Sequence, residues 1–356
     1  MSTRKLGKRS VIGLLGATLG TALGPACGHT PGASGATAPS SPRRAIGGTS
    51  APLNAPAERL YLATQTGLSV VDAGSGKLDF AVPGAVPSPE GSRFVTCTHE
   101  GDTTHLRLID AVDGSVRGAV SLHGRLSARV VSPRATRVAL VEQDSAGPNP
   151  WTPAGRERTT LVVADPSGET PPRSYELEGN YEPEAFAADL RGLFVIQHLP
   201  ALAPDRYRVR RFDLARGIPG PILTVKLTEV ATEEEMRGKG RMQVFAPRLT
   251  TLYTLYTRQD DHLHTRDSIA AGGTGRPNPD VHAFVHVLNL EQGWAYCLDL
   301  PAPFGTGPSQ SHAIGVAPNG RRLFVADCST GWMATADPTS LQVGHVTRVR
   351  EVAGAP

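Results

Sequence analysis

Histidines and carboxylates gather in and just after a long insertion between residues 258 and 280. The candidate metal ligands there are Asp260, His262, His264 and His282. Alternate residues of an extended segment lie on one face, so His262 and His264 could approach one cation together with a neighbouring carboxylate. Such ligands suit Zn²⁺ or Ca²⁺. However, the spacing matches no standard metal motif, and Gly272-Gly273 and Pro277 interrupt the segment. A solvated polar loop is therefore the alternative, and no cofactor is predicted.

A second polar segment carries an indole and two guanidinium groups. Trp151 could stack on a ligand, and Arg156 and Arg158 could clamp an anionic one. Tyr207 is a further ligand-binding candidate. The structural alternative is that these side chains cap the rim of the fold. The sequence contains no nucleophile elbow, Cys-x-x-Cys, His-Glu-x-x-His or phosphate-binding glycine loop, so no catalytic residue is identified.

The chain from residue 58 onward repeats one unit of short apolar strands and turns. The first strand of each unit is expected at residues 59–63, 93–97, 137–141, 192–196, 251–255 and 322–326. The next strand is expected to close at Asp72, Asp110, Asp165, Asp213, Asn289 and Asp337. A period of about 40–50 residues with three or four strands is typical of a β-propeller. The 39 glycines and 30 prolines agree with an all-β fold rich in turns.

The turn before the first strand has a recognisable composition. Residues 88–93 and 317–322 place an acid or an amide directly before glycine, which supplies the positive φ angle of a tight hairpin. Residues 132–137 have Ala135 at this position instead.

The last unit, with Ala317–Asp327 and Ala336–Leu341, resembles the YVTN-type, lactonase-like β-propeller repeat. The resemblance extends weakly over residues 58–350 and is sharp near 87–122 and 315–345. It implies a propeller that usually has seven blades. We therefore expect a seventh unit between Asp213 and Asn289, although six units remain the alternative. Lactonases and quinoprotein dehydrogenases of this superfamily use dispersed residues, so the resemblance also leaves a lactonase or hydrolase-type enzyme open.

Three consecutive units carry long insertions between the two strands described above. They run from Glu142 to Arg158, from His198 to Arg206 and from Arg258 to Asp280. In a propeller these connections emerge on the face that usually binds ligands, so they predict a wall on one side of that face. Tolerated drift in surface loops is the alternative.

The N-terminus has the pattern of an export signal. Residues 1–26 combine a basic start, an apolar stretch from Val11 to Leu23 and small residues before Cys27. A cysteine at this place resembles the acylated cysteine of bacterial lipoproteins, and free secretion after ordinary cleavage is the alternative. Residues 27–57 are rich in Gly, Ala, Pro, Ser and Thr and predict a flexible tether to a domain at 58–356.

Charge and cysteine content constrain the partners. Removal of residues 1–26 takes four of the 36 basic residues, which leaves 32 against 33 acids, so nucleic acid is not an expected partner. Cys97, Cys297 and Cys328 are expected to be reduced and mostly buried. We therefore predict an exported, membrane-anchored, monomeric β-propeller that binds a protein or small-molecule ligand at the cell surface.

Overall fold

The computed structural model describes residues 59–64, 67–142, 153–224, 231–232, 235–237, 239–257 and 282–349. Regular structure in these residues is β-strand, apart from one turn of 3-10 helix, η1 (Ser309–Ser311). Within this part of the chain, no helix has the length and apolar character needed to span a membrane. The expected all-β class is confirmed. The export signal, Cys27 and the tether lie outside the described residues.

The described strands form six antiparallel meanders, numbered I to VI in chain order. Meander I consists of β1 (Arg59–Thr64), β2 (Gly67–Asp72) and β3 (Leu78–Pro83). Meander II consists of β4 (Val86–Pro87), β5 (Arg93–Glu100), β6 (Thr103–Asp110) and β7 (Val116–His123). Meander III consists of β8 (Leu126–Val131), β9 (Val138–Glu142), β10 (Arg158–Ala164) and β11 (Arg173–Glu178).

The second half of the chain follows the same plan. Meander IV consists of β12 (Asn180–Phe186), β13 (Gly192–Leu199), β14 (Arg206–Asp213) and β15 (Ile218–Thr224), with β16 (Ala231–Thr232) paired to β15. Meander V consists of β17 (Lys239–Phe245), β18 (Thr251–Thr257), β19 (Ala283–Asn289) and β20 (Trp294–Leu300). Meander VI consists of β21 (His312–Val316), β22 (Leu323–Asp327), β23 (Trp332–Asp337) and β24 (Gln342–Arg348).

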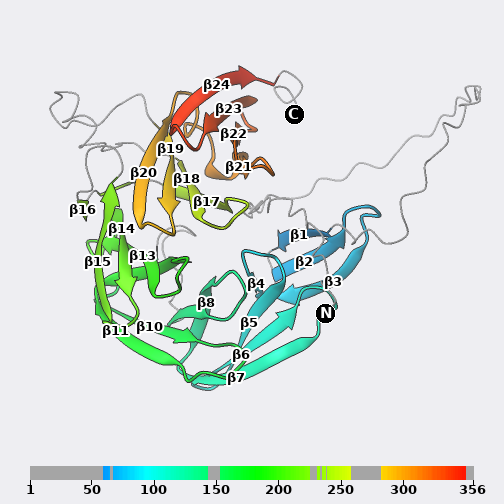
Figure 1. The fold of residues 1–356 in the computed structure, drawn as a ribbon, viewed down its shortest axis with the longest axis vertical. Helices are drawn as coiled ribbons and strands as arrows, with labels where there is room; N and C mark the ends of the chain where they lie inside the picture. The colour runs from blue at the N-terminus through cyan, green and yellow to red at the C-terminus, as the bar shows by residue number, and fades with distance from the viewer. Residues whose placement is uncertain are drawn as a thin grey trace, which may run out of the picture.

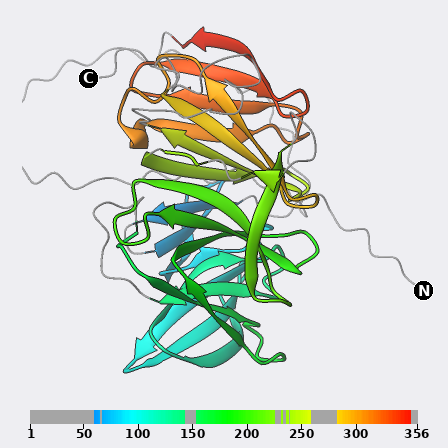
Figure 2. The ribbon, with the colours of Figure 1, turned by 90° about the vertical axis from the view of Figure 1, so that its left-hand side faces the viewer.

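The meanders follow one another around a common centre, as in a β-propeller (Figure 1). The first strands β4, β8, β17 and β21 lie nearest the middle, and the last strands β7, β11, β15 and β24 lie outside. Seen at right angles, meander II (cyan) to meander VI (red) rise from bottom to top (Figure 2). Meanders IV and V are joined into one nine-stranded sheet because β15 pairs in parallel with β20, with Leu223 opposite Trp294.

Apolar clusters between consecutive meanders hold this arrangement together. Each of the five clusters draws its side chains from two neighbouring meanders. The alternation of strand side chains explains how one strand serves two clusters. In β9, Val138 and Leu140 face meander II, whereas Ala139 and Val141 face meander IV. Face-to-face packing of small sheets, the physical basis of the propeller prediction, is therefore observed.

The predicted repeat is confirmed at the level of strands. The six strands predicted to open the units coincide with β1, β5, β9, β13, β18 and β22 to within one residue at the start. In meanders II to VI, however, they are the second strand, because an inner strand precedes each of them. The interval between Asp213 and Asn289, where a seventh unit was expected, supplies β15, the short β16 and the first three strands of meander V. The described residues contain no further meander there. No strand of meander I pairs with meander VI within the described ranges.

The repeated acids at the strand ends are turn residues. Asp213 accepts the backbone N–H groups of Ala215 and Arg216 at 2.8 and 3.0 Å, and Asn289 makes the equivalent two bonds in meander V. Such bonds satisfy backbone donors that the strand ladder leaves free. The recurrence of Asp in the sequence therefore reflects turn formation rather than a repeated binding site.

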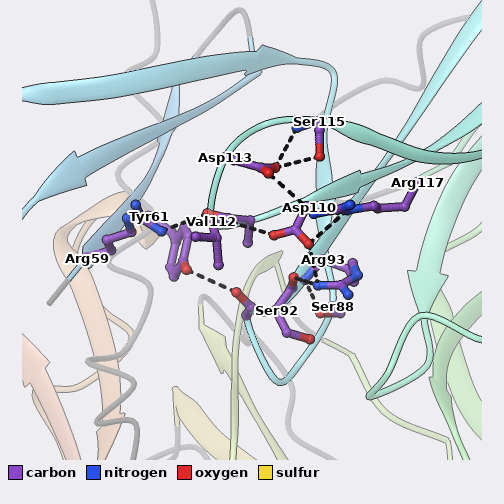
Figure 3. Close-up of polar contacts among 12 residues, drawn as sticks. Arg59, Tyr61, Ser88, Ser92, Arg93, Asp110, Val112, Asp113, Ser115 and Arg117 are labelled. Atoms are coloured by element: carbon purple, nitrogen blue, oxygen red, sulfur yellow. Dashed lines mark hydrogen bonds and ion pairs between the residues drawn. The ribbon is translucent and has the colours of Figure 1, made fainter. Parts of the chain in front are cut away.

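Asp110 differs from a simple turn acid because it also forms ion pairs (Figure 3). It is 6% exposed, and it accepts hydrogen bonds from the Val112 N–H at 2.8 Å and from the Arg117 guanidinium at 3.1 Å. Arg93, its partner across the β5–β6 ladder, forms an ion pair with it at 3.1 Å. In the same view Tyr61 of meander I donates its hydroxyl to the carbonyl of Gly91 at 3.0 Å. Polar contacts at this edge thus join meanders I and II beside their shared core.

The positive φ angles predicted for the turns before β5, β9 and β22 are also present. Gly91 and Gly320 have φ of 66° and 72°. Ala135, at the position that lacks glycine, has φ of 56°, a conformation that costs energy for a residue with a Cβ. The turn geometry is therefore maintained in meander III without the residue that suits it best.

The turn carboxylates predict that the protein loses stability in acid. The backbone N–H groups of Arg216 and Ala215 hold the pKa of Asp213 below the ordinary value of 3.8, and the pKa values of Asp72 and Asp337 are lowered by similar turn bonds. A carboxyl whose pKa falls on folding stabilises the native state above its unfolded pKa, and this contribution is lost as the pH falls through the folded value. The midpoint of thermal unfolding should therefore fall steeply as the pH drops below about 4.

The substitution Asp213→Asn tests this explanation. Asparagine keeps the turn bonds, as Asn289 shows, but it removes the titrating charge. The variant should lose less of its thermal midpoint on acidification than the native protein does. Glu291→Gln, at an exposed side chain, is the control. Identical acid profiles for Asp213→Asn and the native protein would contradict the assignment.

Candidate functional site

The long connections between the second and third strands lie at the same end of their meanders. In an antiparallel meander, the connection between the second and third strands and the start of the first strand lie at the same end. The β9–β10 and β13–β14 connections therefore share an end with the beginnings of β12 and β21. We call this end the loop edge. The third insertion and residues 143–152 of the first lie outside the described residues.

The first two insertions pack against each other. Arg156 donates its backbone N–H to the carbonyl of Ala201 at 3.0 Å. The Asn180 side-chain amide bridges both loops, since it donates to Ala154 and Ala201 carbonyls at 2.9 and 3.1 Å. A Cβ on Gly155 would lie 1.9 Å from the Leu202 oxygen, so only glycine permits this approach. Residues 153–157 and 200–205 thus form one unit, which we call the wall.

A charged trio lies beneath the wall. Glu182 of β12 accepts a hydrogen bond from Arg156 of the wall at 2.8 Å and forms an ion pair with Arg129 of β8 at 3.3 Å. Arg156 also donates to the carbonyl of Tyr181. The side chains of Arg156 and Glu182 are only 12% and 13% exposed, whereas Arg129 is 35% exposed. Two guanidinium groups share one carboxylate, so the trio carries a formal charge of +1, with Arg129 as its most accessible member.

A second carboxylate lies two positions further along β12. Glu184 is 3% exposed, and it accepts hydrogen bonds from Gln243 and Thr254 of meander V, each at 3.3 Å. An irregularity in the β12–β13 register falls between Pro183 and Ala185, next to this residue. Glu182 thus connects β12 to meander III, and Glu184 connects it to meander V. The innermost strand of meander IV is the polar link between its neighbours.

Another buried polar group on the loop edge contains the residue types of a hydrolytic triad. Ser311 Oγ lies 3.4 Å from His312 Nδ1, and His312 Nε2 lies 3.7 Å from Asp327. The imidazole Nδ1 lies 3.0 Å from the carbonyl of Pro308, to which it must donate, and Nε2 accepts the N–H of Gly305 at 3.0 Å. With its acceptor nitrogen occupied, His312 cannot take a proton from Ser311. This group therefore orders the 301–311 connection, and its histidine does not serve as a general base for Ser311.

Asp327 is ionised within this group. Its burial opposes ionisation, but hydrogen bonds from the hydroxyls of Ser329 and Thr330 outweigh this effect and lower the pKa of Asp327. The Ser329 and Thr330 hydroxyls donate to it at 2.6 and 2.8 Å. Its charge is therefore stabilised by the turn that follows β22.

The structure separates the residues predicted as ligand-binding. Arg156 lies in the trio. Arg158, at the start of β10, is 67% exposed and pairs with Glu178 at 2.6 Å. Tyr207 is 6% exposed, and its ring stacks on Tyr256 at 5.0 Å within the core between meanders IV and V. The predicted residues outside the described part of the chain are Trp151, Asp260, His262 and His264.

The predicted metal cluster can be followed only at His282. This residue immediately precedes β19, and its carbonyl lies so close to Gly305 that a Cβ there would be 2.0 Å from the oxygen. Among the described residues, no group of three or more His, Cys, Asp and Glu side chains is arranged to hold a metal ion. The zinc or calcium site around residues 260–264 remains a prediction.

The cysteines are reduced, as predicted, in the described part of the chain. Cys97 is partly buried and Cys297 is buried, but Cys328 is exposed. Burial raises the pKa of the Cys97 thiol. Cys328 differs from the expectation because it is the first residue of the turn after β22 rather than part of the strand.

The sequence analysis missed Arg129, Glu182 and Glu184. The available signal was the pair of acids in Tyr181-Glu182-Pro183-Glu184, within a strand that is otherwise mainly apolar or small. A charged residue in a buried strand needs a partner, and this requirement could have marked the segment. The identity of that partner depends on the packing of two meanders and is not visible in the sequence.

The fold and these contacts define the chain as a β-propeller. Its sequence matches no family model and no curated protein. Among solved structures it is similar to hydrazine synthase of Kuenenia stuttgartiensis, at 15% identity with a TM-score of 0.45 over 78% of this chain and 73% of that one. It is also similar to a putative 6-phosphogluconolactonase from Bacteroides uniformis, at 14% identity with a TM-score of 0.42 over 82% and 81% of the chains. A third similar structure is an oligogalacturonate lyase in complex with manganese, at 12% identity with a TM-score of 0.45 over 80% of this chain and 70% of that one. Similarity at this level does not transfer the activities of these proteins to this chain.

Proposed function

We propose that this chain is an exported, lipid-anchored β-propeller that binds a ligand or protein segment at its loop edge, as a monomer at the cell surface. The observation that carries the binding proposal is the packing of the wall against the charged trio. Two insertions from neighbouring meanders are fixed to each other and hold Arg156 onto Glu182. Rigid loops on a stable scaffold are the usual location of binding residues.

The charges of the trio favour a ligand that presents acceptor groups. Arg129 is its accessible cation, and its guanidinium can donate to a carboxylate or carbonyl of a ligand while Glu182 keeps it oriented. Binding rather than hydrolysis is favoured because the Ser311–His312–Asp327 group lacks a free base nitrogen. The lactonase or hydrolase alternative therefore has no geometric support from this group.

Gly155→Ala tests the binding face. The added Cβ would overlap the Leu202 carbonyl, so the two halves of the wall must separate. The full chain is screened by thermal shift against dicarboxylic acids, uronic acid oligosaccharides and short acidic peptides. One class should raise the unfolding temperature in a concentration-dependent way. Gly155→Ala should abolish this shift, whereas Gly315→Ala, where a Cβ has open space, should retain it. A shift unaffected by Gly155→Ala would place the site elsewhere.

Cys27→Ser tests the anchor. The native chain, expressed in a bacterium that processes lipoproteins, should incorporate labelled palmitate and sediment with membranes. The variant should do neither. If the variant remains in the membrane fraction, acylation at Cys27 is wrong, while the proposal for the loop edge is untouched.

A further inference from the structure

Two sulfur-containing side chains and one imidazole meet between meanders IV and V. His286 of β19 and Cys297 of β20 are directly opposite in the antiparallel ladder, so their side chains project from the same face. That face packs on meander IV, since the neighbouring Phe284 and Ala295 belong to the cluster between these two meanders. Met236 is placed there by two backbone hydrogen bonds with Tyr207, at 2.7 and 2.9 Å.

The three residues line one small cavity. Its volume is about 20 Å³, room for one water molecule or one ion, and its remaining lining residues are Val209, Ile222, Ala295 and Tyr296. Met236, His286 and Cys297 are 5%, 2% and 6% exposed. The Cys297 Sγ and Met236 Sδ atoms are 3.7 Å apart. Two sulfur ligands about 2.3 Å from one ion in a trigonal, three-ligand site would be separated by about 4.0 Å, so the two sulfur atoms lie close to the spacing that a shared ion requires.

We propose that Met236, His286 and Cys297 form a binding site for one cuprous ion. Thiolate, thioether and imidazole groups are ligands that select Cu(I). Charge also favours this ion, because one thiolate neutralises one Cu⁺ and the complex can remain in an apolar cavity without net charge. Zn²⁺ would keep a positive charge with these ligands and usually requires four of them, and none of the described residues that line the cavity carries a carboxylate.

Metal binding would displace one proton and would involve no change of oxidation state. In the metal-free protein the Cys297 thiol donates toward the Met236 sulfur. On binding, the S–H bond breaks, a bond between sulfur and copper forms, and the proton leaves to solvent. Met236 and His286 contribute neutral lone pairs. Affinity should therefore decrease as the pH falls, by about tenfold per pH unit below the thiol pKa.

The experiment uses the full chain with Cys27, Cys97 and Cys328 replaced by serine, which leaves Cys297 as its only thiol. This protein is titrated anaerobically with Cu(I) in competition with bicinchoninate, and thermal unfolding is recorded in parallel. We expect one Cu(I) per chain, a thiolate-to-copper absorption band in the ultraviolet, and a higher unfolding temperature with the metal.

Two further substitutions identify the ligands. Cys297→Ser in the same background should lower the affinity by at least about 100-fold. Met236→Leu, which preserves volume, should lower it by at least about tenfold, whereas the matched change Met242→Leu, in the core between meanders V and VI, should leave it unchanged. Absence of binding in the background protein, or binding unaffected by Met236→Leu, would overturn the proposal. If Cys297→Ser does not fold, the Met236→Leu and Met242→Leu pair decides alone.

Discussion

Replacing Phe94 by alanine should lower the free energy of unfolding by about 3–5 kcal/mol. The Phe94 side chain in β5 is fully buried, and two aromatic rings of meander I meet it edge to face. The ring centroids of Tyr61 and Phe80 lie 5.5 and 6.3 Å from that of Phe94. Truncation removes these contacts and leaves a cavity in the core between meanders I and II. This core is small, so few neighbouring side chains can move to fill the cavity. Urea denaturation of the variant and the native protein gives the difference directly.

The location of this cavity makes the prediction more specific. Meander I has three strands, and the core shared with meander II is its main apolar contact in the described residues. Amide exchange in residues 67–83 should therefore accelerate more in Phe94→Ala than exchange in β18–β20. Leu78→Ala, at a side chain that is 60% exposed in the same meander, should change stability by less than about 0.5 kcal/mol. Equal effects of the two substitutions would contradict the assigned core.

The strands could be predicted from the sequence because their determinants are local. Apolar alternation, a turn and a terminal acid lie within about 20 residues of one another. Each acid accepts a backbone N–H from two or three positions later, as Asp213 and Asp337 do. The register of each hairpin follows from such turns. These features recur in every meander, with Asn289 in place of the acid in meander V. The recurrence made the turn before β9 recognisable even though Ala135 replaces its glycine.

The binding residues depend on packing between meanders and were only partly predictable. Arg156 was selected for its guanidinium, but its partner Glu182 lies 26 positions away in the next meander. Tyr207 was also a ligand-binding candidate, yet its ring stacks within the core. A sequence shows which side chain is charged or aromatic, whereas its exposure depends on how two sheets meet. The parallel pairing of β15 with β20 also depends on packing between meanders. Neither strand has a sequence feature that distinguishes it from the other strands as the site of such a pairing, so the pairing could not be predicted.

Removal of Glu182 is the second substitution with a large expected effect. Glu182→Ala should destabilise the protein by about 3 kcal/mol, because it leaves Arg156 and Arg129 without their shared carboxylate, and Arg156 is largely buried. Arg156→Ala should cost less, about 2 kcal/mol, since Arg129 still neutralises Glu182 at 3.3 Å. The double variant should be more stable than the sum of the two changes indicates, by about 1–3 kcal/mol.

The pair Arg158 and Glu178 provides the matched control for this double-mutant cycle. It joins the same residue types at 2.6 Å, but its side chains are 67% and 78% exposed. Solvent screens such a pair, and the coupling in its cycle should be below about 0.5 kcal/mol. If both cycles give the same coupling, burial does not strengthen the Arg156–Glu182 contact. The wall would then be held by its backbone hydrogen bonds and by the approach of Gly155 to Leu202.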